Sequence, residues 1–226
     1  FFSTTTRQPQ ILCGLVGSEM CITDICKTVG MIGAGYQARG QLEGICAVRD
    51  VSSVKVFDIS EEFSAKFAEE MQEELSVPIS TVSSAEEAVS DVDIVITMTT
   101  TRKPVLLGDW LQPGQHINAA GSNHWIRQEV DDNVIKRANR IVVDSIEDAK
   151  IEAGDLLFPI ERGRVMWSGI RDLSDLVAGH ILGRESDEEI TLFESQGIAI
   201  SDIAAANFVY KKAIELGHGT DLPIDS

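Results

Sequence analysis

Short apolar runs recur along the chain and alternate with longer stretches in which apolar and polar residues are mixed. Strands that are buried on both faces of a parallel sheet have this continuous apolar character. Between Thr28 and Asp144 the pattern predicts six buried strands, at residues 29–32, 54–57, 77–82, 93–99, 116–120 and 140–144.

The stretches between these runs carry apolar residues at helical spacing. In residues 61–75, Phe63, Phe67 and Met71 form one stripe, and the glutamates form a solvated opposite face. Helices are predicted at residues 37–48, 61–75, 84–89 (capped by Ser83 or Ser84), 129–138 and 146–153. Because strands and helices alternate, we expect an α/β fold, a Rossmann-type doubly wound parallel sheet with right-handed crossovers.

The two ends of the chain follow this pattern less well. From Gly154 the sequence predicts an irregular segment, then a small amphipathic helix at 173–183, a strand at 189–194 and a long helix at 196–216. Gly217 is expected to end the long helix. Residues 1–27 show no periodicity that indicates a helix or a strand.

A glycine-rich turn follows the first predicted strand. Residues Gly33-Ala34-Gly35-Tyr36-Gln37-Ala38 have the G-x-G-x-x-A form of a dinucleotide-binding turn. Gly33 permits the tight turn, Gly35 lets the backbone approach a pyrophosphate, and Ala38 lets the next helix pack closely on the sheet. That helix then directs its N-terminus at the phosphates. By itself the motif is a weak signal, since glycine-rich turns are common.

An acidic residue strengthens the prediction. Asp58 ends the second strand, 25 residues after Gly33, where an acceptor for the adenine-ribose hydroxyls is needed. The alternative is that Asp58 caps the helix that begins near Ser60. Strand, turn, helix, strand and acid together predict NAD as the cofactor. NADP is less suited, because residues 59–62 contain no Arg to receive a 2′-phosphate.

Two threonines close the fourth strand. Thr97 and Thr99 lie at its carboxyl end, at the switch point where ligands bind in open α/β sheets, so we expect them to contact the cofactor. The alternative is that threonine occurs here because of its strand propensity alone.

Composition excludes several classes of function. The 43% hydrophobic content predicts a substantial core, and the formal net charge of −17 argues against nucleic acid or an anionic membrane surface as a partner. No apolar run approaches the roughly 18 residues of a membrane span. Cys13, Cys21 and Cys26 form no C-x-x-C pair, so no metal site is expected, and Cys46 is expected to be a core residue. A cytoplasmic location follows from this cysteine usage.

Five segments resemble the ornithine cyclodeaminase/μ-crystallin family, in the family's order and spacing. They are the glycine turn through Arg39, Asn118-Ala-Ala-Gly-Ser-Asn with Glu129 downstream, Val143-Asp-Ser, Glu152-Ala-Gly-Asp-Leu, and Gly183-Arg-Glu-Ser-Asp-Glu-Glu-Ile-Thr-Leu-Phe-Glu-Ser-Gln-Gly197. The resemblance covers residues 28 to about 222, and its last segment is specific to the family. It implies NAD(P)-dependent hydride transfer at the α-carbon of an amino acid or cyclic imine, by an enzyme that is commonly a homodimer.

The resemblance also implies site residues. Ser195 corresponds to a residue near the nicotinamide, although it is equally expected to cap the long helix that begins at Gln196. Gly121 and Ser122 are expected beside the nicotinamide, and Arg127 near the cofactor ribose or on the surface. Where cyclodeaminases have an acid/base Asp, this chain has Asn123. Because an amide has no titratable proton in the working pH range, this departure disfavours deamination and leaves hydride transfer possible.

The resemblance predicts three parts of the chain. These are a non-native segment at 1–27, an NAD-binding domain at 28–195, and a helix and tail at 196–226 that belong to an incomplete substrate and dimerisation domain. The Arg and Lys residues that hold the substrate carboxylate in the family are not recognisable in residues 1–27. The chain as given is therefore expected to be catalytically incompetent. Three functions stay open: an amino-acid or imine oxidoreductase, a cyclodeaminase proper, and a non-catalytic cofactor- or ligand-binding protein.

Overall fold

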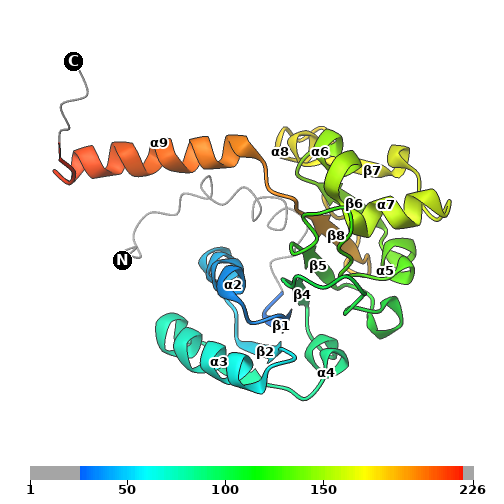
Figure 1. Ribbon diagram of the computed structural model, residues 1–226, viewed down its shortest axis with the longest axis horizontal. Helices are drawn as coiled ribbons and strands as arrows, with labels where there is room; N and C mark the ends of the chain where they lie inside the picture. Colours follow the sequence, from blue (N-terminus) through cyan, green and yellow to red (C-terminus); the bar gives the residue numbers. More distant parts are fainter. Residues whose placement is uncertain (1–25, 221–226) are drawn as a thin grey trace.

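The structure, a computed structural model, describes residues 26–220 (Figure 1). The predictions for residues 1–25, including those for Cys13 and Cys21, fall outside the described residues. Cys26 is buried, and Cys46 packs against the core as predicted.

Within the described residues, eight strands form one sheet in the order β3-β2-β1-β4-β5-β8-β6-β7, and every pair of neighbours is parallel. This confirms the doubly wound fold, with the switch in strand order between β1 and β4. The seven predicted strands are present as β1 (Thr28–Ile32), β2 (Ser53–Phe57), β3 (Ile79–Thr81), β4 (Ile94–Thr97), β5 (His116–Ala119), β6 (Arg140–Val143) and β8 (Thr191–Glu194). The sequence missed β7 (Ile170–Asp172), because three residues with one buried side chain show no periodicity.

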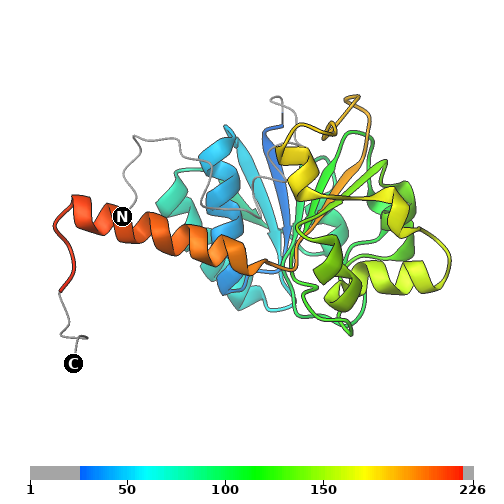
Figure 2. The same ribbon diagram turned by 90° about the horizontal axis from the view of Figure 1, so that it is seen from above.

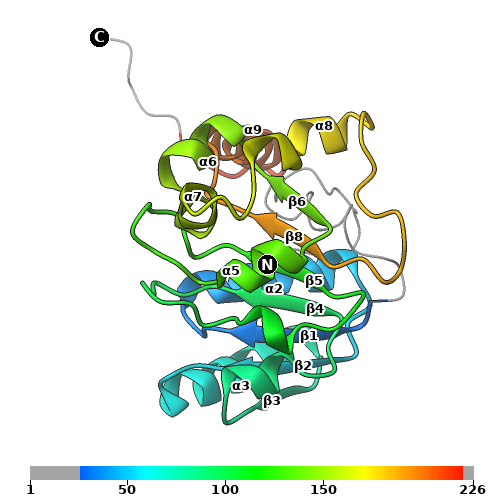
Figure 3. The ribbon, with the colours of Figure 1, turned by 90° about the vertical axis from the view of Figure 1, so that its right-hand side faces the viewer.

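Helices cover both faces of the sheet, as Figures 1 and 3 show. One face is covered by α2 (Tyr36–Val48), α3 (Glu61–Leu75) and α8 (Leu173–Val177). The other is covered by α4 (Ala85–Val89), α5 (Asp132–Arg137), α6 (Ile146–Glu152) and α7 (Gly154–Glu161). Two short 3₁₀ turns, η2 (Gly108–Trp110) and η3 (Trp167–Gly169), complete the connections.

Local capping sets several helix ends. Ser60 caps α3 by accepting a hydrogen bond from the Phe63 N–H, and Ser84, not Ser83, caps α4. The α5 helix begins at Asp132, not Glu129, because Asp131 caps it.

Two predictions for the later helices were wrong. Residues 154–161 form helix α7 where an irregular segment was expected, although Pro159 lies inside the helix. Burial of Leu156 and the hydrogen bonds that Asp155 accepts from the Glu129 and Val130 N–H groups outweigh the unfavourable proline. The α8 helix ends at Val177, because Gly179 adopts a left-handed conformation (φ 73°) and closes a Schellman motif.

The last helix, α9 (Ala199–Glu215), extends away from the sheet and its helices (Figures 1 and 2). It has no buried residue, and most of its large apolar side chains are exposed, namely Ile200, Ile203, Val209, Tyr210 and Ile214. Within residues 26–220, no helix combines the length and apolar character that crossing a membrane requires.

Candidate functional site

The glycine turn fits against the end of β4. Gly33 has a φ of 105°, and a Cβ at this position would lie 2.4 Å from the Met98 carbonyl oxygen. Only glycine combines this left-handed backbone with so close an approach. The turn is therefore fixed at the point between β1 and β4 where the strand order reverses.

Gly35 differs from Gly33, because nothing in the described protein requires a glycine there. Its backbone is extended (φ −72°, ψ −175°), and a Cβ would meet no atom within 4 Å. The α2 helix starts at the next residue, without a side-chain cap and without an acidic residue in its first turn. An open position beside unpaired N–H donors suits a pyrophosphate, which needs close approach and donors. Ala38 is fully buried, as expected for close packing of α2 on the sheet.

Asp58 follows β2 and lies next to the glycine turn. Its Oδ2 accepts a hydrogen bond from the Ala34 N–H (2.9 Å), and its Oδ1 accepts one from the Ser60 N–H (2.9 Å). Asp58 is therefore not the cap of α3, since Ser60 has that role. Instead it ties the end of β2 to the glycine turn, and a carboxylate remains at the place where ribose hydroxyls are bound in this fold class.

The buried carboxylate of Glu129 joins the ends of β4 and β5. It accepts four hydrogen bonds, from the Thr97 hydroxyl (3.0 Å), the Thr99 hydroxyl (2.6 Å), the Thr99 N–H (2.6 Å) and the Gly121 N–H (2.7 Å). A Cβ on Gly121 would lie 2.2 Å from the Thr99 carbonyl oxygen, so the two strand ends are in direct contact. The Thr97 and Thr99 hydroxyls therefore have an internal partner, and their contact with a cofactor stays a prediction.

Asp155 binds the backbone of Glu129 and its neighbour Val130. At the start of α7, its Oδ1 accepts hydrogen bonds from the Glu129 N–H (2.7 Å) and the Val130 N–H (3.0 Å). The Ser122 hydroxyl, fully buried, accepts from the Asp155 N–H (3.3 Å) and donates to the Arg127 carbonyl oxygen (3.2 Å). These bonds hold the base of the loop after β5 and leave its tip exposed.

The tip of this loop carries Asn123. The Arg127 guanidinium donates to Asn123 Oδ1 (2.6 Å) and, at 3.5 Å, to the Gly121 carbonyl oxygen. Because Arg127 only donates, the amide oxygen of Asn123 must face it, and the Nδ2 hydrogens are left as donors. His124 and the exposed Trp125 stack beside it, with ring centroids 5.8 Å apart.

Ser195 does not cap the long helix, which corrects that expectation. The α9 helix begins at Ala199, and its N-cap residue Ile198 makes no side-chain cap. The Ser195 hydroxyl instead donates to Asp144 Oδ2 (3.0 Å), which also accepts from the Gly197 N–H (2.7 Å). Asp144, at the end of β6, thus pins the connection between β8 and α9.

Four acidic side chains are buried along this edge. They are Glu129, Asp144, Asp155 and Glu194. Burial raises the pKa of each of them. For Glu194, which lies between β5 and β6 in the sheet, the neighbouring charges of Asp155 and Asp144 raise the pKa further. Neither Glu194 oxygen makes a hydrogen bond of ordinary geometry within the described residues. The nearby Gln196 side chain lowers the pKa, but burial raises it more, so the neutral form of Glu194 is favoured.

The structure thus arranges the predicted residues along one edge of the sheet, in the strand order β2, β1, β4, β5 and β8 (Figure 3). The sequence did not assign roles to Glu129, Asp144 and Asp155, which position the others. All three fall within the family-like segments, but most of their hydrogen-bond partners lie at least 25 residues away in sequence.

The fold and this edge define a Rossmann-type protein with a dinucleotide-binding glycine turn. The family model for the ornithine cyclodeaminase/mu-crystallin family matches residues 22–217. The chain belongs to this family.

Sequence and structural relatives support this family assignment. The chain is 42% identical over 194 residues to Delta(1)-pyrroline-2-carboxylate reductase of Bacillus cereus, which covers 85% of this chain and 59% of the relative. It is 34% identical to ketimine reductase mu-crystallin of Rattus norvegicus, over 80% of this chain and 53% of the relative. The structure of Thermococcus litoralis Delta(1)-pyrroline-2-carboxylate reductase in complex with NADH and L-proline superposes with a TM-score of 0.89 at 40% identity, covering 93% of this chain and 66% of that one. The chain thus spans about 60% of the length of these reductases.

Proposed function

We propose that the chain is the dinucleotide-binding part of an NAD-dependent oxidoreductase that acts on an amino acid or a cyclic imine by hydride transfer at the α-carbon. The observation that carries this proposal is the open position at Gly35 beside the uncapped N-terminus of α2. These residues fit a pyrophosphate, with Asp58 placed for the adenine ribose. The relatives named as imine reductases, one solved with NADH and L-proline, support the same cofactor and substrate class.

In this proposal one set of residues binds the pyrophosphate of the cofactor and another set surrounds its nicotinamide. Gly33, Gly35, Tyr36, Gln37 and Ala38 form the pyrophosphate cradle. Thr97, Thr99, Gly121, Ser122 and Ser195 shape the nicotinamide end, the two threonines and Ser122 by holding the backbone rather than by free hydroxyls. When bound, the nicotinamide supplies or accepts the hydride.

In this proposal Asn123 orients the substrate. Its oxygen is held by Arg127, so its Nδ2 hydrogens are available to a substrate carboxylate or carbonyl oxygen. It transfers no proton, which favours imine reduction or amino-acid oxidation over a cyclodeaminase mechanism.

We further propose a second domain that contains α9 and joins at the Ser195–Gly197 connection, with residues 28–195 as the cofactor domain. The exposed apolar residues of α9 support it, because such a face is normally covered by protein. A homodimer is proposed through this domain, since one related structure is an alanine dehydrogenase dimer with bound NAD. The cytoplasmic location is also a proposal.

The test is incubation of the protein with NADH and a panel of cyclic imines, and of 2-oxo acids with ammonia. Loss of reduced-nicotinamide absorbance with at least one of them is expected from a chain extended to the full length of its relatives. NADH binding without any turnover by a chain extended to the full length of its relatives would favour the alternative, a non-catalytic binding protein. Absence of NADH binding would refute the proposal.

A further inference from the structure

Arg39 is an unusual residue for its position in the fold. It is the fourth residue of α2, close to a helix N-terminus, where a positive charge is disfavoured by the helix dipole. No acidic residue lies in the first turn of α2 to offset it. A structural reason for Arg39 must therefore come from outside its own helix.

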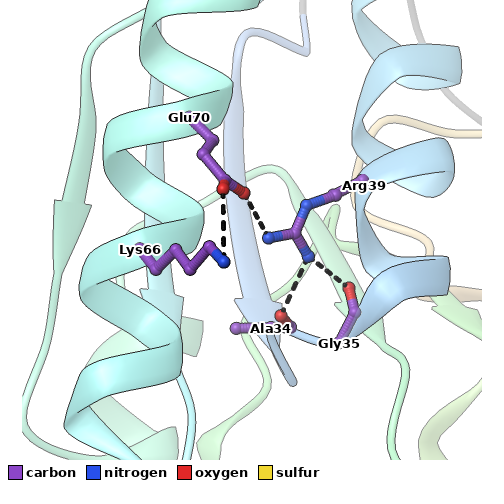
Figure 4. Close-up of polar contacts among 5 residues, drawn as sticks. All are labelled: Ala34, Gly35, Arg39, Lys66 and Glu70. Atoms are coloured by element: carbon purple, nitrogen blue, oxygen red, sulfur yellow. Dashed lines mark hydrogen bonds and ion pairs between the residues drawn. The ribbon is translucent and has the colours of Figure 1, made fainter.

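Figure 4 shows where the guanidinium lies. Its Nη1 donates to the Gly35 carbonyl oxygen (3.1 Å) and, at 3.4 Å, to the Ala34 carbonyl oxygen. Its Nη2 donates to Glu70 Oε2 on α3 (2.5 Å), and the guanidinium lies over the Phe67 ring, 5.5 Å from the centroid. Lys66 lies 3.7 Å from the other Glu70 oxygen and makes no contact with the turn.

These contacts fix the direction of two peptide groups. In a trans peptide the N–H points opposite to the C=O, and no peptide in the described part of the chain is cis. By holding the Ala34 and Gly35 oxygens, Arg39 turns the N–H groups of Gly35 and Tyr36 the other way. Neither of these N–H groups has a hydrogen-bond partner among residues 26–220.

We infer that Arg39 is a positioning residue for the pyrophosphate of a bound dinucleotide, acting through the carbonyl groups of the glycine turn. Glu70 and Phe67 hold the guanidinium in place, so the donors of the turn are aimed before the ligand arrives. Preorganisation of this kind raises affinity because less order must be imposed on binding. The inference rests on the proposed function, since it assumes that this turn binds a dinucleotide.

The experiment measures NADH and ADP-ribose dissociation constants by calorimetry for wild type, Arg39→Lys, Arg39→Gln and Lys66→Gln. Lys66→Gln is the matched control, because it removes one positive charge from the same cluster without touching the turn. We expect Arg39→Gln to weaken both ligands about tenfold and Arg39→Lys to weaken them about fivefold, since an ammonium cannot hold two carbonyls and Glu70 together. Lys66→Gln should change either constant less than twofold.

Thermal unfolding without ligand separates positioning from general damage. The melting temperature of Arg39→Lys is expected to stay close to that of wild type, so its weaker binding cannot come from unfolding. Wild-type affinity in Arg39→Lys would overturn the inference, because charge alone would then suffice. Equal weakening by Lys66→Gln would overturn it for the same reason. Failure of the wild type to bind either ligand would instead refute the proposed function.

Discussion

The hydrogen bonds around Glu129 make a strong prediction for one substitution, Glu129→Gln. The change keeps the size of the side chain but replaces one acceptor oxygen with a donor. Glu129 Oε1 faces the N–H and hydroxyl of Thr99, and Oε2 faces the Thr97 hydroxyl and the Gly121 N–H. A hydroxyl can rotate to accept from an amide, but a backbone N–H cannot. Whichever way the new amide is oriented, one buried N–H, of Thr99 or of Gly121, loses its partner.

The magnitude follows from these contacts. A buried N–H without a partner costs about 1–3 kcal/mol, and the two bonds that remain change from charge-assisted to neutral, which costs roughly 0.5–1 kcal/mol each. Burial raises the pKa of Glu129, so removing its charge offsets part of the loss. We expect the free energy of unfolding to fall by about 2–4 kcal/mol. The ends of β4 and β5 should also separate, which weakens NADH binding at the nicotinamide end.

Urea unfolding followed by circular dichroism measures the change, with an unchanged m-value as the sign that stability alone is altered. Glu73→Gln is the matched control, because Glu73 is an exposed residue of α3 and the chemical change is the same. Its effect should stay within about 0.5 kcal/mol. A loss of less than about 0.5 kcal/mol in Glu129→Gln would show that the four donors find other partners, and that Glu129 does not organise this edge.

Three further predictions concern pH, cofactor choice and product. Burial and the charges of Asp155 and Asp144 raise the pKa of Glu194 above 4.5, so its contribution to stability is largest at low pH and is lost as the pH rises through the folded-state pKa. In urea titrations Glu194→Gln should therefore gain stability relative to wild type as the pH rises above 4.5. Parallel curves of stability against pH for the two proteins would contradict this. Titration of both reduced cofactors should show tighter NADH than NADPH, by about 1–3 kcal/mol, because Asp58 repels a 2′-phosphate; equal or tighter NADPH binding would count against that role. Finally, ornithine should give no proline above background, because Asn123 has no titratable proton, and ammonia release with proline formation would show that another group performs the transfer.

The sequence by itself determined the architecture. Buried parallel strands must be apolar throughout, so the runs ending near Ile32, Phe57 and Thr97 identified their strands directly. Local rules were equally sufficient for the glycine turn and for α3, whose observed bounds are those that the sequence predicted. In such segments the information lies within a few neighbouring residues. The family could be recognised for the same reason, since its motifs are continuous in sequence.

Only the tertiary structure decided how the side chains of the site are used. The sequence predicts contact of Thr97 and Thr99 with the cofactor, which stays a prediction, but it gave no sign that their hydroxyls donate to Glu129, about thirty residues away. Ser195 looked like a helix cap, yet it binds Asp144 from a neighbouring strand. The partner of a hydroxyl or carboxylate is set by strand order and packing, which bring together residues that no local pattern connects. The same reason explains α7, where burial of Leu156 and the hydrogen bonds that Asp155 accepts stabilise a helix that its proline disfavours.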